Sequence, residues 1–240
     1  MYNLTLMKFL FVFAHPDDET FSSGGTIAKL TQNRHKVILA TATKGEAGEP
    51  GNPPITTRDK VGEVREQELR RAAKIMGILR IHFLGFIDGK VRYSRNKKLQ
   101  GKILTILKKE KPDVVVTFDK GGGSNHPDHK AVSRATTTVF KEYKNLVKKH
   151  VRLYHTAMPR SFIKEFEKKG LGYNAFGKVR GVKDDNITTV ININDTLQTK
   201  IKALKEHKTQ HRDWERFIER IKDAKVSNEF FRLVDENNFA

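Results

Sequence analysis

The chain has 240 residues, with 46 lysines and arginines against 28 aspartates and glutamates, which gives a net charge of +18, and it has no cysteine. The missing cysteine excludes disulfide bonds and thiolate chemistry, and it fits a reducing compartment, so we expect a cytoplasmic protein. The length predicts one domain over residues 1–240, large enough to bury a sizeable core. No secretory signal peptide is evident, and no apolar run approaches the roughly 18 residues that suggest a membrane span.

The positive charge raises the question of nucleic-acid binding. The cations are spread along the chain and are densest in residues 97–111 and 141–183. There is no arginine-rich tail, and aromatic residues do not interleave with basic ones as they do in RNA-binding motifs. We therefore expect no specific nucleic-acid partner, only weak binding at low salt. A basic nucleic-acid-binding protein is kept as the alternative from a different class.

Hydrophobic patterning predicts strands that alternate with helices along the chain. The strands are expected at residues 7–14, 37–43, 81–84, 113–118, 151–157 and 188–193. The helices are expected at 22–30, 62–76, 99–109, 129–148 and 195–222, the last with Asp195 as its N-cap. This alternation predicts an α/β, Rossmann-like fold with a mostly parallel sheet and helices on both faces. The weakly periodic segment 157–187 is expected to form a cap that covers the site or selects the substrate.

Two polar clusters follow directly on predicted strands. The first is His15-Pro-Asp17-Asp18, after the strand at 7–14, and the second is His126-Pro-Asp128-His129, after the strand at 113–118. A single His-Pro-Asp is most often only a turn. In parallel sheets, however, ligands bind outside the carboxyl ends of the strands, so both clusters are expected at one edge of the sheet. Two such turns at one edge predict a metal site.

Histidine and carboxylate are good ligands for zinc, and a catalytic zinc keeps one position open for water beside three protein ligands. The first cluster can supply two ligands and the second cluster the third. The pKa of zinc-bound water falls to about 7, and a carboxylate that is not on the metal can serve as general base. A spare histidine can polarise a carbonyl or protonate a leaving group. The glycine-rich pieces, Gly24-Gly25 and residues 121–123, match neither nucleotide-binding pattern.

These residues resemble the LmbE-like or PIG-L deacetylase family, through AHPDDE after the first strand and HPDH after a later one. Supporting matches are TKGEAGE (43–49), Arg65 with Glu68, GFIDG (85–89) and ALKEHKTQ (203–210), with Thr209 where the family has serine. The resemblance covers about residues 8–135 and the helix at 200–210, whereas 140–190 matches nothing that we can place. It implies a Rossmann-like, metal-dependent N-deacetylase of N-acetylglucosaminyl compounds, with the site at the carboxyl edge of the strands.

The resemblance also implies roles, residue by residue. The metal would be zinc or another divalent ion such as Fe²⁺. Its ligands would be His15, Asp18 and His129, and the general base would be Asp17. His126 would stabilise the oxyanion or protonate the leaving amine, and Asp128 would orient His126. The sugar would be held by Arg65 and Asp88, with Glu46 as a further candidate. The partner would be a small N-acetylated amino sugar.

The substrate itself is left open by the sequence. A zinc amidohydrolase that acts on a small amide without a sugar is the alternative within the enzyme class. The excess of lysine and arginine could favour an acidic aglycone, but we prefer to interpret it as a composition bias. A homo-oligomer is compatible with the sequence, and its subunit contacts would be expected in segment 157–187.

Overall fold

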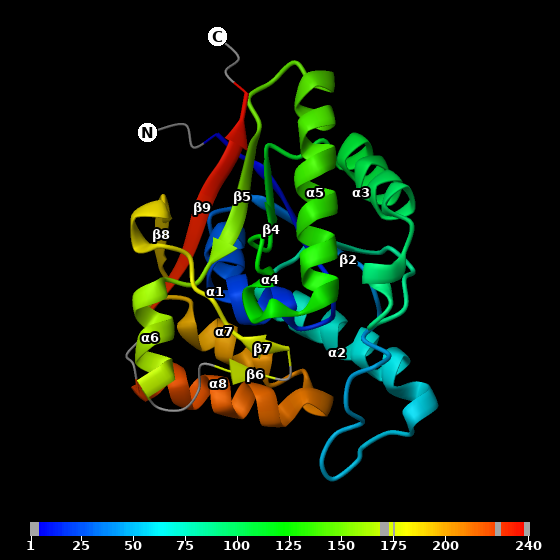
Figure 1. Cartoon of the computed structure of the whole chain (residues 1–240), viewed down its shortest axis with the longest axis vertical. Helices are drawn as coiled ribbons and strands as arrows, with labels where there is room; N and C mark the ends of the chain where they lie inside the picture. Colours follow the sequence, from blue (N-terminus) through cyan, green and yellow to red (C-terminus); the bar gives the residue numbers. More distant parts are fainter. Residues whose placement is uncertain (1–4, 169–172, 175, 224–226, 238–240) are drawn as a thin grey trace.

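The chain is described by a computed structural model, in which residues 5–168, 173–174, 176–223 and 227–237 are placed. Its centre is a seven-stranded sheet with the order β3-β2-β1-β4-β5-β9-β8 (Figure 1). The strands are β1 (Lys8–Phe13), β2 (Lys36–Thr41), β3 (Arg80–Phe83), β4 (Val114–Thr117), β5 (Arg152–Ala157), β8 (Thr189–Asn192) and β9 (Asn228–Glu236). Strands β1 to β5 pair in parallel, and β9 runs antiparallel to both of its neighbours. The prediction of a mostly parallel sheet is confirmed.

Helices cover both faces of the sheet, as predicted. Helices α3 and α5 pack against each other on one face, and α1, α2 and α7 pack together on the other (Figure 1). The helices are α1 (Asp18–Gln32), α2 (Val61–Met76), α3 (Asn96–Glu110), α4 (Gly122–Asn125), α5 (Pro127–Leu146), α6 (Arg160–Lys168), α7 (Leu197–Leu204) and α8 (His211–Asp223). Short 3-10 turns are η1 (Arg58–Lys60), η2 (Val91–Tyr93), η3 (Asp184–Asn186) and η4 (Lys208–Gln210), and a small hairpin is formed by β6 (Tyr173–Asn174) and β7 (Gly177–Lys178). No helix in the described part of the chain is long and apolar enough to cross a membrane.

The central strands are covered on both faces. Residues 10 to 14, from β1 into its loop, are all at most 1% exposed. A strand that is buried on both faces carries a continuous apolar run, and LFVFA is such a run. The apolar run therefore ends where the sheet ends, and the first polar cluster begins there.

The expected single helix over 195–222 is wrong. Helix α7 ends at Leu204 and α8 begins at His211, and the N-cap of α7 is Thr196, not Asp195. Between the two helices the side chain of Thr209 turns inward to the buried carboxylate of Glu68. The helical pattern of the sequence continues across this break, but tertiary hydrogen bonds interrupt it.

Strand β9 is not predicted by the sequence, and it attaches the C-terminal part to α1. Glu229 of β9 and Lys200 of α7 form an ion pair of 2.6 Å, and their side chains are only 4% and 3% exposed. Glu229 also accepts from the backbone N–H groups of Gly25 (3.0 Å) and Thr26 (2.7 Å) in α1. A buried charge needs such partners, because an unpaired one is costly.

We expect Lys200→Met to lower the free energy of unfolding by about 3–5 kcal/mol, because it leaves the Glu229 carboxylate buried without its cation. Urea denaturation measures this change. The matched control is Lys29→Met, since Lys29 pairs with Asp195 at 3.1 Å on the surface, where the side chains are 35% and 57% exposed. That control should change stability by less than about 1 kcal/mol. Equal effects of the two substitutions would contradict the assignment of Lys200 as the structural cation.

Candidate active site

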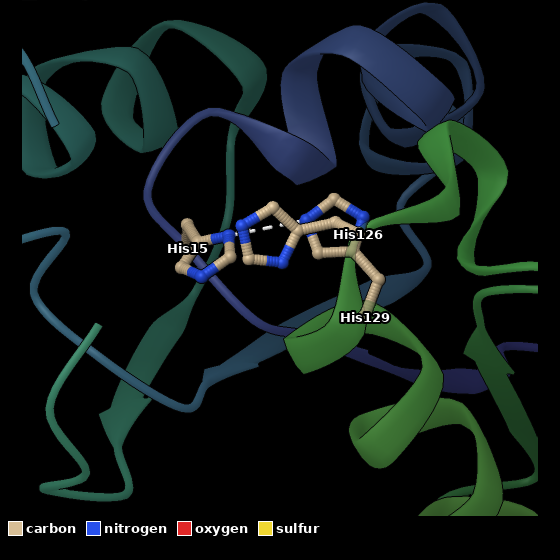
Figure 2. Close-up of side chains that lie close together, drawn as sticks. All are labelled: His15, His126 and His129. Carbon is tan, nitrogen blue, oxygen red and sulfur yellow. Dashed lines mark hydrogen bonds between the residues drawn. The ribbon is translucent and has the colours of Figure 1, made fainter. Parts of the chain in front are cut away.

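The two polar clusters meet where β1 and β4 end. These strands are parallel neighbours, and each is followed by a turn that leads into a helix. Helix α5 begins at Pro127, and its N-cap is His126, whose Nδ1 accepts from the backbone N–H of Asp128 at 3.1 Å. Proline suits this first position, because its N–H is missing where none is needed. As a result, the rings of His15, His126 and His129 face one another, with centroids 4.7 to 5.0 Å apart (Figure 2).

Four polar atoms from three residues converge at the centre of this cluster. His15 Nδ1 lies 3.1 Å from His129 Nε2. Asp18 Oδ1 lies 3.2 Å from His129 Nε2, and Asp18 Oδ2 lies 3.5 Å from His15 Nδ1. Ligand atoms around a tetrahedral zinc, with bonds of about 2.0–2.2 Å, are separated by about 3.4 Å. The spacing of the two ring nitrogens and the Asp18 carboxylate fits a metal ion between them.

The outer contacts of the two histidines decide which ring nitrogen carries the proton. His129 Nδ1 lies 2.8 Å from the carbonyl oxygen of Gly122, and His15 Nε2 lies 2.8 Å from Asp88 Oδ1. A carbonyl or carboxylate oxygen only accepts, so each of these nitrogens carries the hydrogen. The lone pairs are then on His129 Nε2 and His15 Nδ1, which face each other. Two lone pairs at 3.1 Å repel unless a proton or a metal ion lies between them.

The charges around the site also favour a cation. Burial alone would lower the pKa of His15, but Asp128, Asp18 and Asp88 outweigh it and raise that pKa well above its ordinary value. Burial would raise the pKa of Asp18, but the adjacent His129 and His15 hold it well below its usual range. The arrangement of carboxylates thus stabilises added positive charge, which a proton or a metal ion can supply.

Asp17 lies beside this centre in an unusual backbone conformation. Its φ is 104°, in the left-handed region that non-glycine residues rarely adopt. Arg65 Nη2 donates to Asp17 Oδ2 at 2.9 Å and to the carbonyl of Pro16 at 2.7 Å. Burial, partly opposed by the charge of Arg65, raises the pKa of Asp17 to about 7. A carboxylate with this pKa can take up and release a proton near neutral pH.

His126 is held as a neutral donor. Burial, assisted by His15 and His129, lowers the pKa of His126 to about 4, so the ring is uncharged at neutral pH. Its Nδ1 accepts a backbone hydrogen bond, which leaves the proton on Nε2. The ring of Phe176, between β6 and β7, packs edge-on against His126 with centroids 4.2 Å apart. The segment expected to be a cap therefore contacts the site through this residue.

The Asp128 carboxylate lies elsewhere than expected. We expected it to orient the ring of His126, but its Oδ2 lies 3.6 Å from His15 Nε2 and its Oδ1 accepts from the backbone N–H of Arg92 at 3.0 Å. The contact with His126 comes from the backbone of Asp128 instead. Asp128 is fully buried, so its carboxylate lies behind His15 rather than at the open side of the site.

The three residues expected to hold substrate lie on one side of the site and contact one another. Arg65 is 4% exposed, and its guanidinium lies against Gly45, where any Cβ would be 2.5 Å from Arg65 Nη1. The backbone N–H of Asp88 donates to Glu46 Oε2 at 3.1 Å. Through these contacts Arg65 supports Asp17, Asp88 supports His15, and Glu46 supports the loop that carries Asp88.

The sequence did not reveal a buried layer behind Asp17. The Asp17 N–H donates to Glu19 Oε2 at 3.2 Å, and His207 Nε2 lies 3.6 Å from Glu19 Oε1. Thr209 donates its N–H and its hydroxyl to Glu68 at 2.8 and 2.7 Å. The available signal was ALKEHKTQ, in which a threonine replaces the family's serine. Either residue supplies a hydroxyl group that can donate a hydrogen bond to Glu68.

The fold and the donor set define the class of protein: an α/β enzyme with a histidine–carboxylate metal site at the carboxyl edge of a Rossmann-like sheet. A family model described as PIG-L, GlcNAc-PI de-N-acetylase, matches residues 10–140. This match spans more than half of the chain, so the chain belongs to that family. It is also similar to the 1D-myo-inositol 2-acetamido-2-deoxy-alpha-D-glucopyranoside deacetylase of Mycobacterium sp. (strain KMS), with 32% identity over 239 residues, 85% of this chain and 74% of that protein.

Solved structures show the same fold. The N,N'-diacetylchitobiose deacetylase from Pyrococcus horikoshii matches with a TM-score of 0.68 and 24% identity over 96% of this chain and 84% of that chain. GalB, the 4-carboxy-2-hydroxymuconate hydratase from Pseudomonas putida KT2440, matches with a TM-score of 0.63 and 16% identity over 97% and 98%. These two proteins are named for different reactions, so the fold alone does not decide the chemistry.

We expect His129→Ala to bind less than about a tenth of the metal held by the wild type, because the substitution would remove one of the three expected ligands. Metal content after zinc loading and dialysis measures this. The control is His82→Ala, since His82 pairs with Glu110 at 2.8 Å in another part of the sheet and should leave the metal content unchanged. Full occupancy in the His129 variant would remove His129 from the ligand set.

Proposed function

We propose that this protein is a metal-dependent N-deacetylase that hydrolyses the acetamide of an N-acetylglucosamine-type substrate. The observation that carries the proposal is the approach of His15 Nδ1, His129 Nε2 and the Asp18 carboxylate, at distances of 3.1 to 3.5 Å. Asp17, which precedes Asp18 in the chain, has a pKa raised to about 7 by burial. Membership in the GlcNAc-PI de-N-acetylase family and the similarity to named deacetylases support the same reaction.

Zinc is the metal that the donor set favours, and His15, Asp18 and His129 would hold it, with Fe²⁺ as another divalent candidate. When bound, such a metal acts as a Lewis acid and makes hydroxide available at neutral pH. Asp18 is suited to bind through one oxygen. Its Oδ2 already accepts from the backbone N–H groups of Ala14 (3.2 Å) and His15 (2.7 Å), and Oδ1 faces the histidines.

Asp17 and His126 have different roles in the reaction. Asp17 takes a proton from the attacking water, a role that suits its raised pKa, and Arg65 fixes the orientation of its carboxylate. His126 donates a hydrogen bond from Nε2 to the carbonyl oxygen as negative charge develops there, and the proton that Asp17 took from the water passes to the leaving amine as the C–N bond breaks. A neutral hydrogen-bond donor that is already in position stabilises the negative charge of the transition state without having to transfer its proton. The products are acetate and a free amino sugar.

The sugar is expected to contact the side of the site formed by Glu46, Arg65 and Asp88. Arg65 and Asp88 are largely committed to Asp17 and His15, so Glu46 is the best candidate among them for direct contact with substrate. The relatives named for a GlcNAc-inositol compound make a small soluble conjugate of N-acetylglucosamine the first substrate to test. A cytoplasmic location and self-association stay predictions from the sequence.

We expect Asp17→Asn to keep its metal and to lose on the order of 10²–10⁴-fold in kcat, because the amide cannot accept the proton. Acetate release from GlcNAc-inositol, diacetylchitobiose, GlcNAc-malate and free GlcNAc measures the reaction, and metal content is the control. A variant that kept near wild-type turnover would refute the assignment of Asp17 as base.

We expect His126→Ala to lower kcat on the order of 10²–10³-fold, as removal of an oxyanion donor typically does, again with the metal retained. The same acetate assay measures the change. A loss of metal equal to that in His129→Ala would instead make His126 a ligand. If the metal-loaded wild type releases acetate from no member of the panel, the N-acetylglucosamine substrate class is wrong, and amides without a sugar become the alternative to test.

A further inference from the structure

The conformation of Asp17 needs support, because a non-glycine residue at φ 104° is strained. Its backbone carbonyl accepts from the N–H groups of Thr20 and Phe21, both at 2.9 Å, as α1 begins. Its backbone N–H donates outside the helix pattern, to Glu19 Oε2 at 3.2 Å. The Glu19 carboxylate therefore acts as a clamp on the peptide that precedes Asp17.

Glu19 is itself held from the far end of the chain. Its side chain is fully buried, and its second oxygen, Oε1, accepts from the Thr20 hydroxyl and faces His207 Nε2 at 3.6 Å. His207 is also fully buried, and its Nε2 lies 3.3 Å from Thr20 Oγ1. A carboxylate without solvent depends on such donors. Because the Thr20 hydroxyl gives its hydrogen to Glu19, His207 Nε2 is the donor to Thr20, and His207 supports Glu19 through Thr20 at the end that does not touch Asp17.

The turn that carries His207 also supports the second group that holds Asp17. The Trp214 indole N–H donates to the carbonyl of His207 at 3.1 Å, which fixes the turn. Two residues later, Thr209 makes two hydrogen bonds to Glu68, which lies three residues after Arg65 on α2. Glu19 accepts from the backbone N–H of Asp17, and Arg65 donates to its carboxylate. Residues 207–209 contact the surroundings of both groups.

From this layered arrangement we infer that Glu19 and His207 form one positioning unit for the general base Asp17, a role that rests on the proposed function. The unit explains why the helical pattern breaks between α7 and α8. Residues 205–210 turn away from a helix so that His207 and Thr209 reach the interior. Neither Glu19 nor His207 reaches substrate, so both act through Asp17.

Two substitutions of His207 test whether this residue acts as a hydrogen-bond donor or only fills space in the interior. His207→Gln keeps an N–H close to the position of Nε2, and His207→Leu fills the same cavity without a donor. We expect His207→Leu to lower kcat about 10- to 100-fold, as loss of an outer hydrogen-bond partner commonly does, with KM within about threefold and the metal retained. His207→Gln should keep most of the wild-type kcat. The double variant that combines Glu19→Gln with His207→Leu should have a kcat no lower than that of the less active single variant, because the two residues act as a unit.

The matched control is Thr196→Val. Thr196 is fully buried and its hydroxyl donates to the carbonyl of Gly25 at 2.9 Å, so it also joins the C-terminal part to α1 but does not touch Asp17. This control should lose stability and keep its kcat. If His207→Leu loses no more kcat than Thr196→Val, or if His207→Gln is as poor as His207→Leu, the positioning role is refuted.

A second readout does not depend on activity. The Asp17 amide should be protected from hydrogen exchange in the wild type and in Thr196→Val, and it should lose protection in Glu19→Gln and His207→Leu. Equal protection in all four proteins would overturn the inference. The expected exchange pattern in a wild type that releases no acetate would leave the positioning unit standing and refute only the proposed reaction.

Discussion

The site depends on one topological constraint, which is that β1 and β4 are neighbours although their helices lead to opposite sides of the sheet. The chain proceeds from β1 to β2 on one side and from β4 to β5 on the other. A crevice forms at such a switch point, because the two loops diverge there. The cluster at 15–18 follows β1, and the cluster at 126–129 follows β4. The order of the strands thus brings His15 and His129, which are more than a hundred positions apart in the sequence, to a distance of 3.1 Å.

Much of this could be predicted from the sequence, because it follows from local pattern. The parallel strands carry apolar runs that end at polar turns, and the edge at which those turns meet follows from topology. The break in the expected helix over 195–222 could not be predicted, since it comes from the hydrogen bonds of Thr209 to Glu68, on an element far away in the sequence. The position of the Asp128 carboxylate depends on the backbone of Arg92, which no local pattern encodes.

The net charge of the protein is opposite to that of its site. The chain carries +18, yet the groups that surround His15 are the carboxylates of Asp18, Asp88 and Asp128. The excess cations are on the outside, as on α3, where five lysines are exposed: Lys97, Lys98, Lys102, Lys108 and Lys109. Coulomb interactions weaken over a Debye length of about 8 Å at physiological salt, so distant surface lysines do not cancel the local negative field. The local field at His15 is therefore dominated by these three carboxylates.

The outer contacts of the histidines decide whether the two motifs make a metal site at all. HPDDE and HPDH supply the rings, but the tautomers are fixed by the Gly122 carbonyl and by Asp88, which lie outside both motifs. Gly122 can approach His129 only as glycine, because its φ is +71° and a Cβ would lie 2.8 Å from that of His129. A chain with both motifs but with a side chain at position 122, or without a carboxylate at position 88, would lose a contact that favours one of these tautomers. A hydratase shares this fold, so the sheet alone does not decide the chemistry.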